Sequence, residues 1–129
     1  MGSHIDGAGT AKLETLEHAV TLVQKLNTIV ERMAQSQRMM QPLAQYRQQI
    51  QRAAAPIASL LKPQFEPISV MLTNLVIVST RGGSDQQKVR SLRESVAQIK
   101  SALDASASRV RKEHAVVDSD ETKTEKPVP

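Results

Sequence analysis

Cysteine and tryptophan are absent from the 129-residue chain, and the aromatic side chains are limited to one tyrosine and one phenylalanine. Without cysteine the chain has no disulfide, no thiolate metal ligand and no cysteine nucleophile. With so few aromatic rings it also lacks the stacking platform on which many proteins bind single-stranded nucleic acid. The hydrophobic core must therefore consist almost entirely of aliphatic side chains and methionine.

Long apolar runs are missing as well. The longest, residues 68–78, has about half of the roughly 20 residues that a transmembrane helix requires. We therefore expect no transmembrane segment. No signal peptide is visible, so the expected compartment is the cytoplasm, unless an export signal was removed when a tag was attached.

The two ends of the chain differ in composition from its middle. Residues 1–10 are interpreted as an expression-tag remnant followed by a linker. Residues 116–129 combine mixed charge with two prolines and show no apolar periodicity, which is typical of a disordered tail. The sequence thus predicts one folded domain, a helical bundle over residues 11–115.

Basic residues outnumber acidic ones. The formal net charge is +4, with +7 in residues 11–115 and −2 in residues 116–129. A basic domain is attracted to a polyanion or an anionic membrane, but the same charge suits an ordinary solvated surface. The net charge alone leaves both interpretations open.

Apolar residues at spacings of three and four predict long amphipathic helices at both ends of the domain. The first covers residues 12–40, with Thr10 as its expected N-cap. The last begins after Ser84, which opens a capping box, and ends near His114. Its buried positions keep heptad spacing, as in a coiled coil, with Ser106 as the one polar member. The apolar members are Val89, Leu92, Val96, Ile99, Leu103 and Val110.

A shorter second helix is expected from Pro42. It should continue through Pro56, which removes a backbone donor and is expected to kink the helix without ending it. Pro63 and Pro67 disfavour helical backbone at the residue before each of them, so residues 62–66 are predicted to form an irregular connection.

Residues 68–80 are rich in β-branched side chains and would suit either a strand or a helix. A helix is favoured because the apolar residues share one helical face, and because a lone strand would leave its backbone groups unpaired. Gly82 and Gly83 are expected to end this helix in the left-handed conformation.

Four helices with short connections predict an all-α fold, an antiparallel up-down four-helix bundle with proline-kinked middle helices. The alternative is a three-helix bundle in which one bent second helix extends from Pro42 to Arg81.

Patterns that carry catalysis or bind metals are missing from the sequence. His18 lacks the flanking residues of histidine phosphotransfer proteins and is interpreted as a surface residue, and His114 lies among cations that complement the helix dipole. Met33, Met39 and Met40 are interpreted as core residues rather than copper ligands. No nucleophile elbow, phosphate loop or metal-binding motif is present. We therefore expect no enzymatic activity, cofactor, metal or small-molecule substrate.

Residues 33–51 are rich in glutamine and methionine, lack acidic residues and contain the only tyrosine. Long, adaptable side chains are suited to accepting a partner helix, although a neutral solvated helix end would have the same composition. The leading hypothesis is a non-enzymatic module for protein–protein interaction or self-association, acting as a scaffold, adaptor or regulatory subunit. Its predicted partner surface consists of Arg38, Gln41, Gln45, Tyr46, Arg47 and Gln49.

Basic residues of the last helix favour an alternative function, binding to nucleic acid or to an anionic surface. Several of them precede an acidic residue by four positions, the less favourable order for an intrahelical ion pair, so helix stability does not explain them. The predicted contacts are Lys88, Arg90, Arg93, Lys100, Arg109, Arg111 and Lys112. A third hypothesis is an apolar ligand held between helices near Pro56.

Overall fold

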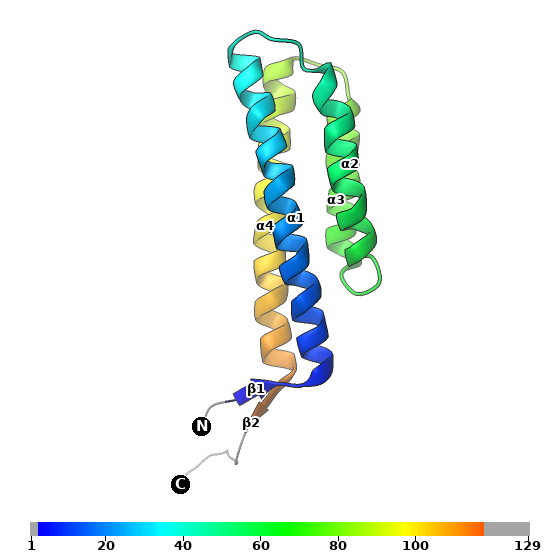
Figure 1. The fold of residues 1–129 in the computed structure, drawn as a ribbon, viewed down its shortest axis with the longest axis vertical. Helices are drawn as coiled ribbons and strands as arrows, with labels where there is room; N and C mark the ends of the chain where they lie inside the picture. The colour runs from blue at the N-terminus through cyan, green and yellow to red at the C-terminus, as the bar shows by residue number, and fades with distance from the viewer. Residues whose placement is uncertain (1–2, 118–129) are drawn as a thin grey trace.

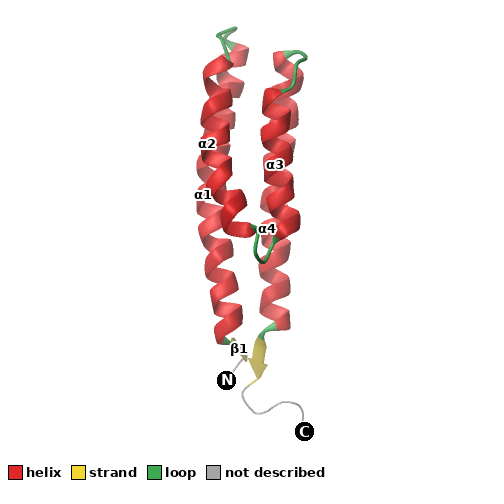
Figure 2. Ribbon diagram, turned by 90° about the vertical axis from the view of Figure 1, so that its right-hand side faces the viewer, coloured by secondary structure: helices red, strands yellow, loops and turns green. Residues whose placement is uncertain are grey.

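The computed structural model of the protein describes residues 3–117 and contains four antiparallel helices joined by short connections (Figures 1 and 2). Each helix packs against its neighbours in sequence, and the most extensive contact is between α1 and α4, so the four helices form a closed up-down bundle. Two three-residue strands pair at the base. The elements are β1 (Ser3–Ile5), α1 (Gly7–Arg38), α2 (Ala44–Leu61), α3 (Glu66–Thr80), α4 (Asp85–Glu113) and β2 (Ala115–Val117).

The four-helix prediction is confirmed, and the three-helix alternative is excluded by the break between α2 and α3. Residues 68–80 form a helix, as their periodicity favours. Pro56 lies within a continuous α2, and its predicted kink stays a prediction. The predicted tail lies outside the described residues from position 118 onward.

Three predicted helix boundaries are wrong. Asp6, not Thr10, caps α1, because its carboxylate accepts a 2.7 Å hydrogen bond from the Gly9 N–H. Lys62 keeps helical backbone before Pro63, with φ −55° and ψ −44°. Glu66 opens α3 directly before Pro67, because the first turn of a helix does not need the missing proline N–H.

A glycine lies between the end of α3 and the start of α4, but its role differs from the predicted one. Arg81 follows α3 in an extended conformation, and the positive φ, +113°, is at Gly83. Gly83 thus turns the chain into α4, whose N-cap Ser84 accepts a 3.1 Å bond from the Gln87 N–H. The predicted cap of α4 is confirmed, whereas the glycines do not form the left-handed cap of α3.

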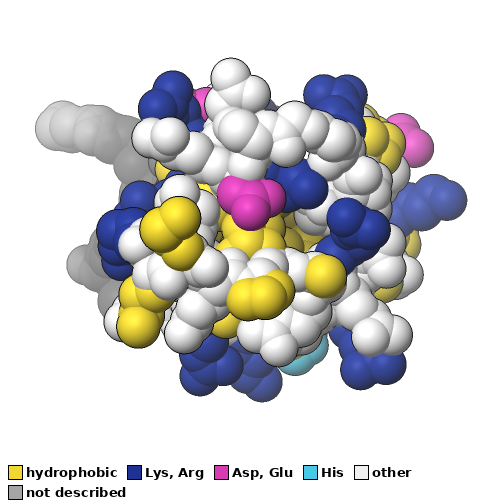
Figure 3. Space-filling view, turned by 90° about the horizontal axis from the view of Figure 1, so that it is seen from above, with side chains coloured by type: hydrophobic (Ala, Val, Ile, Leu, Met, Phe, Trp, Pro, Cys, Tyr) yellow, Lys and Arg dark blue, Asp and Glu magenta, His cyan; other side chains and the backbone are white. Residues whose placement is uncertain are grey.

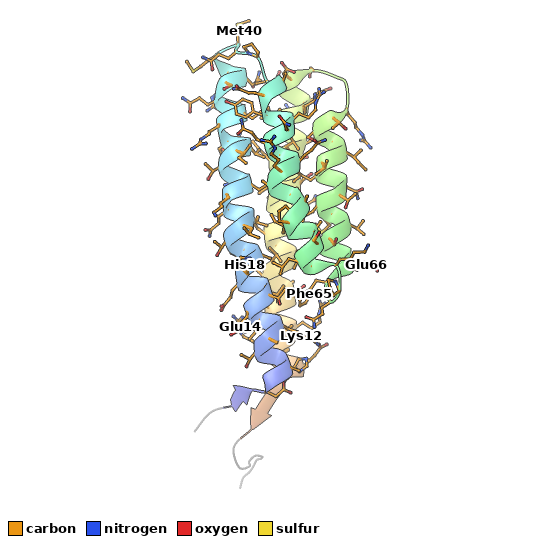
Figure 4. All side chains as sticks on the ribbon, turned by 45° about the vertical axis from the view of Figure 1, so that its right-hand side comes forward. Lys12, Glu14, His18, Met40, Phe65 and Glu66 are labelled. Carbon is orange, nitrogen blue, oxygen red and sulfur yellow. The ribbon has the colours of Figure 1, made fainter. Side chains whose placement is uncertain are left out.

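The end of α1 is a Schellman motif with a methionine at the position where glycine is usual. The Gln41 N–H donates to the Ser36 carbonyl over 2.8 Å, and the Met40 N–H donates to the Gln37 carbonyl over 3.0 Å. Met40 has φ +59°, in the left-handed region. Its side chain projects away from the bundle (Figure 4), so the interpretation of Met39 and Met40 as core residues is wrong.

The core is aliphatic, as the composition requires. All seven predicted heptad positions of α4 are buried, including Ser106. The largest fully buried side chains come from all four helices: Leu16, Val23, Leu26, Val30, Ile50, Ile57, Leu61, Leu72, Leu75, Leu92, Ile99 and Leu103. The bundle is therefore held together mainly by interdigitating leucine, isoleucine and valine side chains.

The helices are unequal, and this divides the molecule into two sections (Figure 1). With 32 and 29 residues, α1 and α4 are about 48 and 43 Å long at 1.5 Å per residue, whereas α2 and α3 have 18 and 15 residues. Below the α2–α3 connection only α1 and α4 continue. Phe65, in that connection, is buried and marks the lower limit of the four-helix section.

Candidate interaction surfaces

The predicted partner surface is only partly at the surface. Arg38, Gln41, Gln45 and Arg47 are exposed, and Gln49 is half-buried. Tyr46 is only 8% exposed, so its assignment to this surface is wrong. The sequence spacing indicated that Tyr46 is buried, because it lies four residues before the core residue Ile50 and therefore on the same helix face.

The Tyr46 hydroxyl has a partner that sequence spacing did not reveal. It lies 2.7 Å from the Ser36 Oγ of α1, and both side chains are buried. This pair joins the end of α1 to the start of α2 immediately below the Schellman turn. Tyr46 is therefore a structural residue that satisfies a buried serine.

Replacing Tyr46 by phenylalanine should lower the free energy of unfolding by about 1–1.5 kcal/mol, because the Ser36 hydroxyl is left buried without its partner. Ser36→Ala in the same background should recover part of this loss. Urea unfolding followed by far-UV circular dichroism measures both effects. Strictly additive losses would show that the two hydroxyls are not energetically coupled.

The basic residues of α4 do not form one stripe. Six of the seven are exposed and Lys88 is half-buried. At about 100° per residue, Arg93, Lys100 and Arg111 lie within roughly 20° of one another, but Arg109 is turned by roughly 160° from Arg93. Moreover, Arg93 forms a two-pronged ion pair with Glu31 of α1, at 2.9 and 3.0 Å. The seven residues therefore do not present a common contact face.

An apolar groove lies between α2 and α3. We call it the α2–α3 groove; it encloses about 460 Å³. Its lining residues are Gln51, Ala54, Ala55, Ala58, Leu72, Thr73, Val76 and Ile77. Ile77 is 45% exposed, and Val70, one and two turns before Thr73 and Ile77 on the same face of α3, is 51% exposed.

Small residues and internal hydrogen bonds shape the α2–α3 groove. The Ser69 hydroxyl donates to the Ala58 carbonyl over 2.9 Å and ties the two helices together. The Thr73 hydroxyl donates to the Ser69 carbonyl of its own helix over 3.2 Å. Gln51 is thus the one lining side chain with polar atoms not used in this way. Sequence reasoning suggested an apolar ligand near Pro56, which lies between the lining residues Ala55 and Ala58, but it did not identify the side of the groove that α3 forms. The apolar residues left outside the predicted buried face of α3 were Val70, Val76 and Ile77.

The base of the molecule holds a cluster that we call the terminal clamp: Asp6, Lys12 and His114. The His114 Nδ1 lies 3.2 Å from the Asp6 carboxylate, and the Lys12 Nζ lies 3.1 Å from the His114 Nε2. The Asp6 N–H also donates to the His114 carbonyl over 3.1 Å. His114 is thus in contact with Asp6 through one ring nitrogen and with Lys12 through the other.

The terminal clamp joins the start of α1 to the end of α4. The hydrogen bond from the Gly9 N–H holds the pKa of the Asp6 carboxyl below its usual value, and His114 and Lys12 act in the same direction. Below the clamp β1 and β2 pair antiparallel, with His4 opposite Val116. His114 thus has specific partners beyond the helix dipole. We assign the clamp a structural role because its hydrogen bonds join the start of α1 to the end of α4.

Comparisons with known proteins find no matching family, curated protein or solved structure. Within residues 3–117, no helix is both long enough and apolar enough to cross a membrane. In the same part of the chain, no three His, Cys, Asp or Glu side chains are grouped so that they could hold a metal ion. The exposed surfaces are therefore the features of the molecule that indicate a function.

Proposed function

We propose that the protein is a non-enzymatic interaction module that binds an amphipathic helix of another protein in the α2–α3 groove. The observation that carries this proposal is the partial exposure of Ile77 in a groove that Ala54, Ala55 and Ala58 also line, with Val70 exposed on the same face of α3. Alanine side chains let a third helix approach α2 and α3 closely, in the packing that the bundle itself uses. A helix seated there would remove Ile77 from water, with favourable free energy in proportion to the apolar area buried.

The charge of the surface around α2 and α3 indicates the charge of the partner helix. Residues 44–81, which form the two short helices and their connection, carry four cations and a single acid, Glu66. A helix with an apolar face and acidic borders complements this surface. A second copy seated symmetrically would bring the same basic surface against itself, which disfavours self-association through the groove.

The test uses a displayed library of amphipathic helices with varied charge at the borders, selected for binding to the intact protein. We expect the enriched helices to be acidic at their borders. Ala55→Gln should weaken their binding at least tenfold, because Ala55 is exposed in the lining of the groove and the longer side chain would occupy the space of the bound helix. Ala105→Gln on α4 is the matched control, since Ala105 is also exposed on a helix but lies away from the groove.

Three results would contradict the proposal. The first is a selection that enriches no helix, or enriches basic ones. The second is equal affinity of the selected helices for the Ala55→Gln protein. The third is a concentration-dependent dimer, seen by light scattering, that Ala55→Gln abolishes, which would make a second copy the occupant. Thermal stabilisation by small apolar ligands, lost on the same substitution, would instead favour the ligand hypothesis.

A further inference from the structure

The end of the bundle opposite the termini carries most of the net positive charge of the described chain. We call this end the tip; it comprises residues 38–47 and 81–90, including the α1–α2 and α3–α4 connections (Figure 1). Its charged residues are Arg38, Arg47, Arg81, Lys88, Arg90 and one acid, Asp85. Elsewhere in residues 3–117 there are ten cations against eight acids, so the tip is more basic than the much longer remainder.

These cations are available to a ligand. Four of the five are exposed, and Lys88 is half-buried. Among the described residues none of the five forms an ion pair with a carboxylate, in contrast to Arg93 below them. Figure 3 looks down on the tip and shows Lys and Arg side chains around the outline of the molecule, hydrophobic side chains at the surface between them, and one acidic side chain near the centre of the view.

Two methionines form the apolar part of the tip. Met40 is 93% exposed and Met39 is 60% exposed, and Met40 projects from the outermost turn (Figure 4). Met40 also occupies the left-handed position of the Schellman motif, which glycine or asparagine would adopt at lower cost. Because its side chain packs against almost nothing, the fold does not account for this unfavourable choice, and a contact outside the fold would.

We propose that the tip binds the surface of an anionic lipid bilayer, with the cations near the lipid phosphates and Met39 and Met40 inserted at the acyl boundary. Basic residues that surround a projecting apolar side chain are complementary to such an interface, where both parts find a partner. The phosphate backbone of a nucleic acid would match the cations but would leave both methionines in water. Arg47 and Arg81 also belong to the basic surface of residues 44–81, but Met39, Met40 and the other three cations of the tip lie outside it, so this inference does not require a ligand in the α2–α3 groove.

The first experiment measures co-sedimentation with vesicles of phosphatidylcholine and phosphatidylserine in equal parts, with pure phosphatidylcholine vesicles as reference. We expect binding to the anionic vesicles only, weakening steeply as salt is added. Arg38→Glu combined with Arg81→Glu should reduce the binding constant by roughly 25-fold or more, since each basic residue near an anionic surface contributes about a fivefold factor. Lys25→Glu combined with Lys100→Glu is the matched control, because it changes the net charge equally on exposed helix positions away from the tip.

The second experiment tests insertion of the methionines. Met40→Asn removes the apolar side chain but suits the left-handed backbone, so the fold should be unaffected while vesicle binding weakens. Because the chain has no cysteine, Met40→Cys provides a unique site for an environment-sensitive fluorophore. Its emission should shift to the blue on anionic vesicles, and the same label at Thr28, exposed on α1, should not respond.

Absence of vesicle binding at low salt would overturn the proposal. So would equal losses in the two charge-reversed proteins, which would show that net charge rather than the tip is responsible. Binding to duplex DNA that Met40→Asn does not alter, together with an unresponsive label at position 40, would assign the cations to nucleic acid instead.

Discussion

Replacing Leu26 by alanine is expected to lower the free energy of unfolding by about 2–5 kcal/mol, the range found when a large aliphatic side chain is removed from a tightly packed core. Leu26 is fully buried on α1, the longest helix. The loss combines the lost burial of the isobutyl group with the cavity that neighbouring aliphatic side chains cannot fill. For a small domain stabilised by about 5–15 kcal/mol, such a loss is a large fraction of the total.

Leu22→Ala provides the matched control for this prediction. Leu22 is on the same helix, one turn earlier, but is only partly buried, so helix propensity changes equally and burial does not. We expect a loss of roughly 1 kcal/mol there, because water can replace part of the lost contact. Urea unfolding of both proteins separates the two effects. Equal losses at positions 22 and 26 would mean that the core is loosely packed and that the bundle is held by helix propensity instead.

Replacing Pro56 by alanine should have the opposite sign and raise the free energy of unfolding by about 1–3 kcal/mol. Pro56 lies within α2, its side chain is exposed, and it has no N–H to donate to the Arg52 carbonyl. Alanine restores that donor and removes the clash of the ring with the preceding turn. The increased flexibility of the unfolded chain offsets part of the gain.

Pro63→Ala serves as the control for Pro56. Pro63 lies in the α2–α3 connection, where no helical hydrogen bond can be gained, so we expect a small loss of stability. Thermal unfolding by calorimetry distinguishes the two substitutions by sign. A loss of stability on Pro56→Ala would show that the predicted proline kink is required for α2 to pack against α1 and α3.

Features that depend on neighbouring residues in the sequence could be predicted. The heptad positions of α4 and the Ser84 cap needed only periodicity and one local hydrogen bond, and both are confirmed. The break between α2 and α3 followed from two prolines in a short segment. Where local rules failed, as at Lys62 before Pro63, a statistical preference of the backbone was overridden by the fold.

Features that depend on distant residues could not be predicted. The hydroxyls of Tyr46 and Ser36, on different helices, share a hydrogen bond, and Asp6 meets a histidine 108 residues away. Predicting the α2–α3 groove would have required knowing which sides of α2 and α3 face outward. This depends on which helices pack against one another. The exposure of Met40 depended on a turn geometry for which its residue type is unusual.

The terminal clamp and the strand pair below it also determine how the protein is oriented when it is attached to a surface. They place both ends of the described chain side by side, at the end of the α1–α4 pair opposite the tip. A surface, label or fusion partner attached at either end would stand about 48 Å from the tip, the length of α1. Immobilised protein would therefore present the tip and the α2–α3 groove outward together, and both proposed ligands could be measured on one oriented sample.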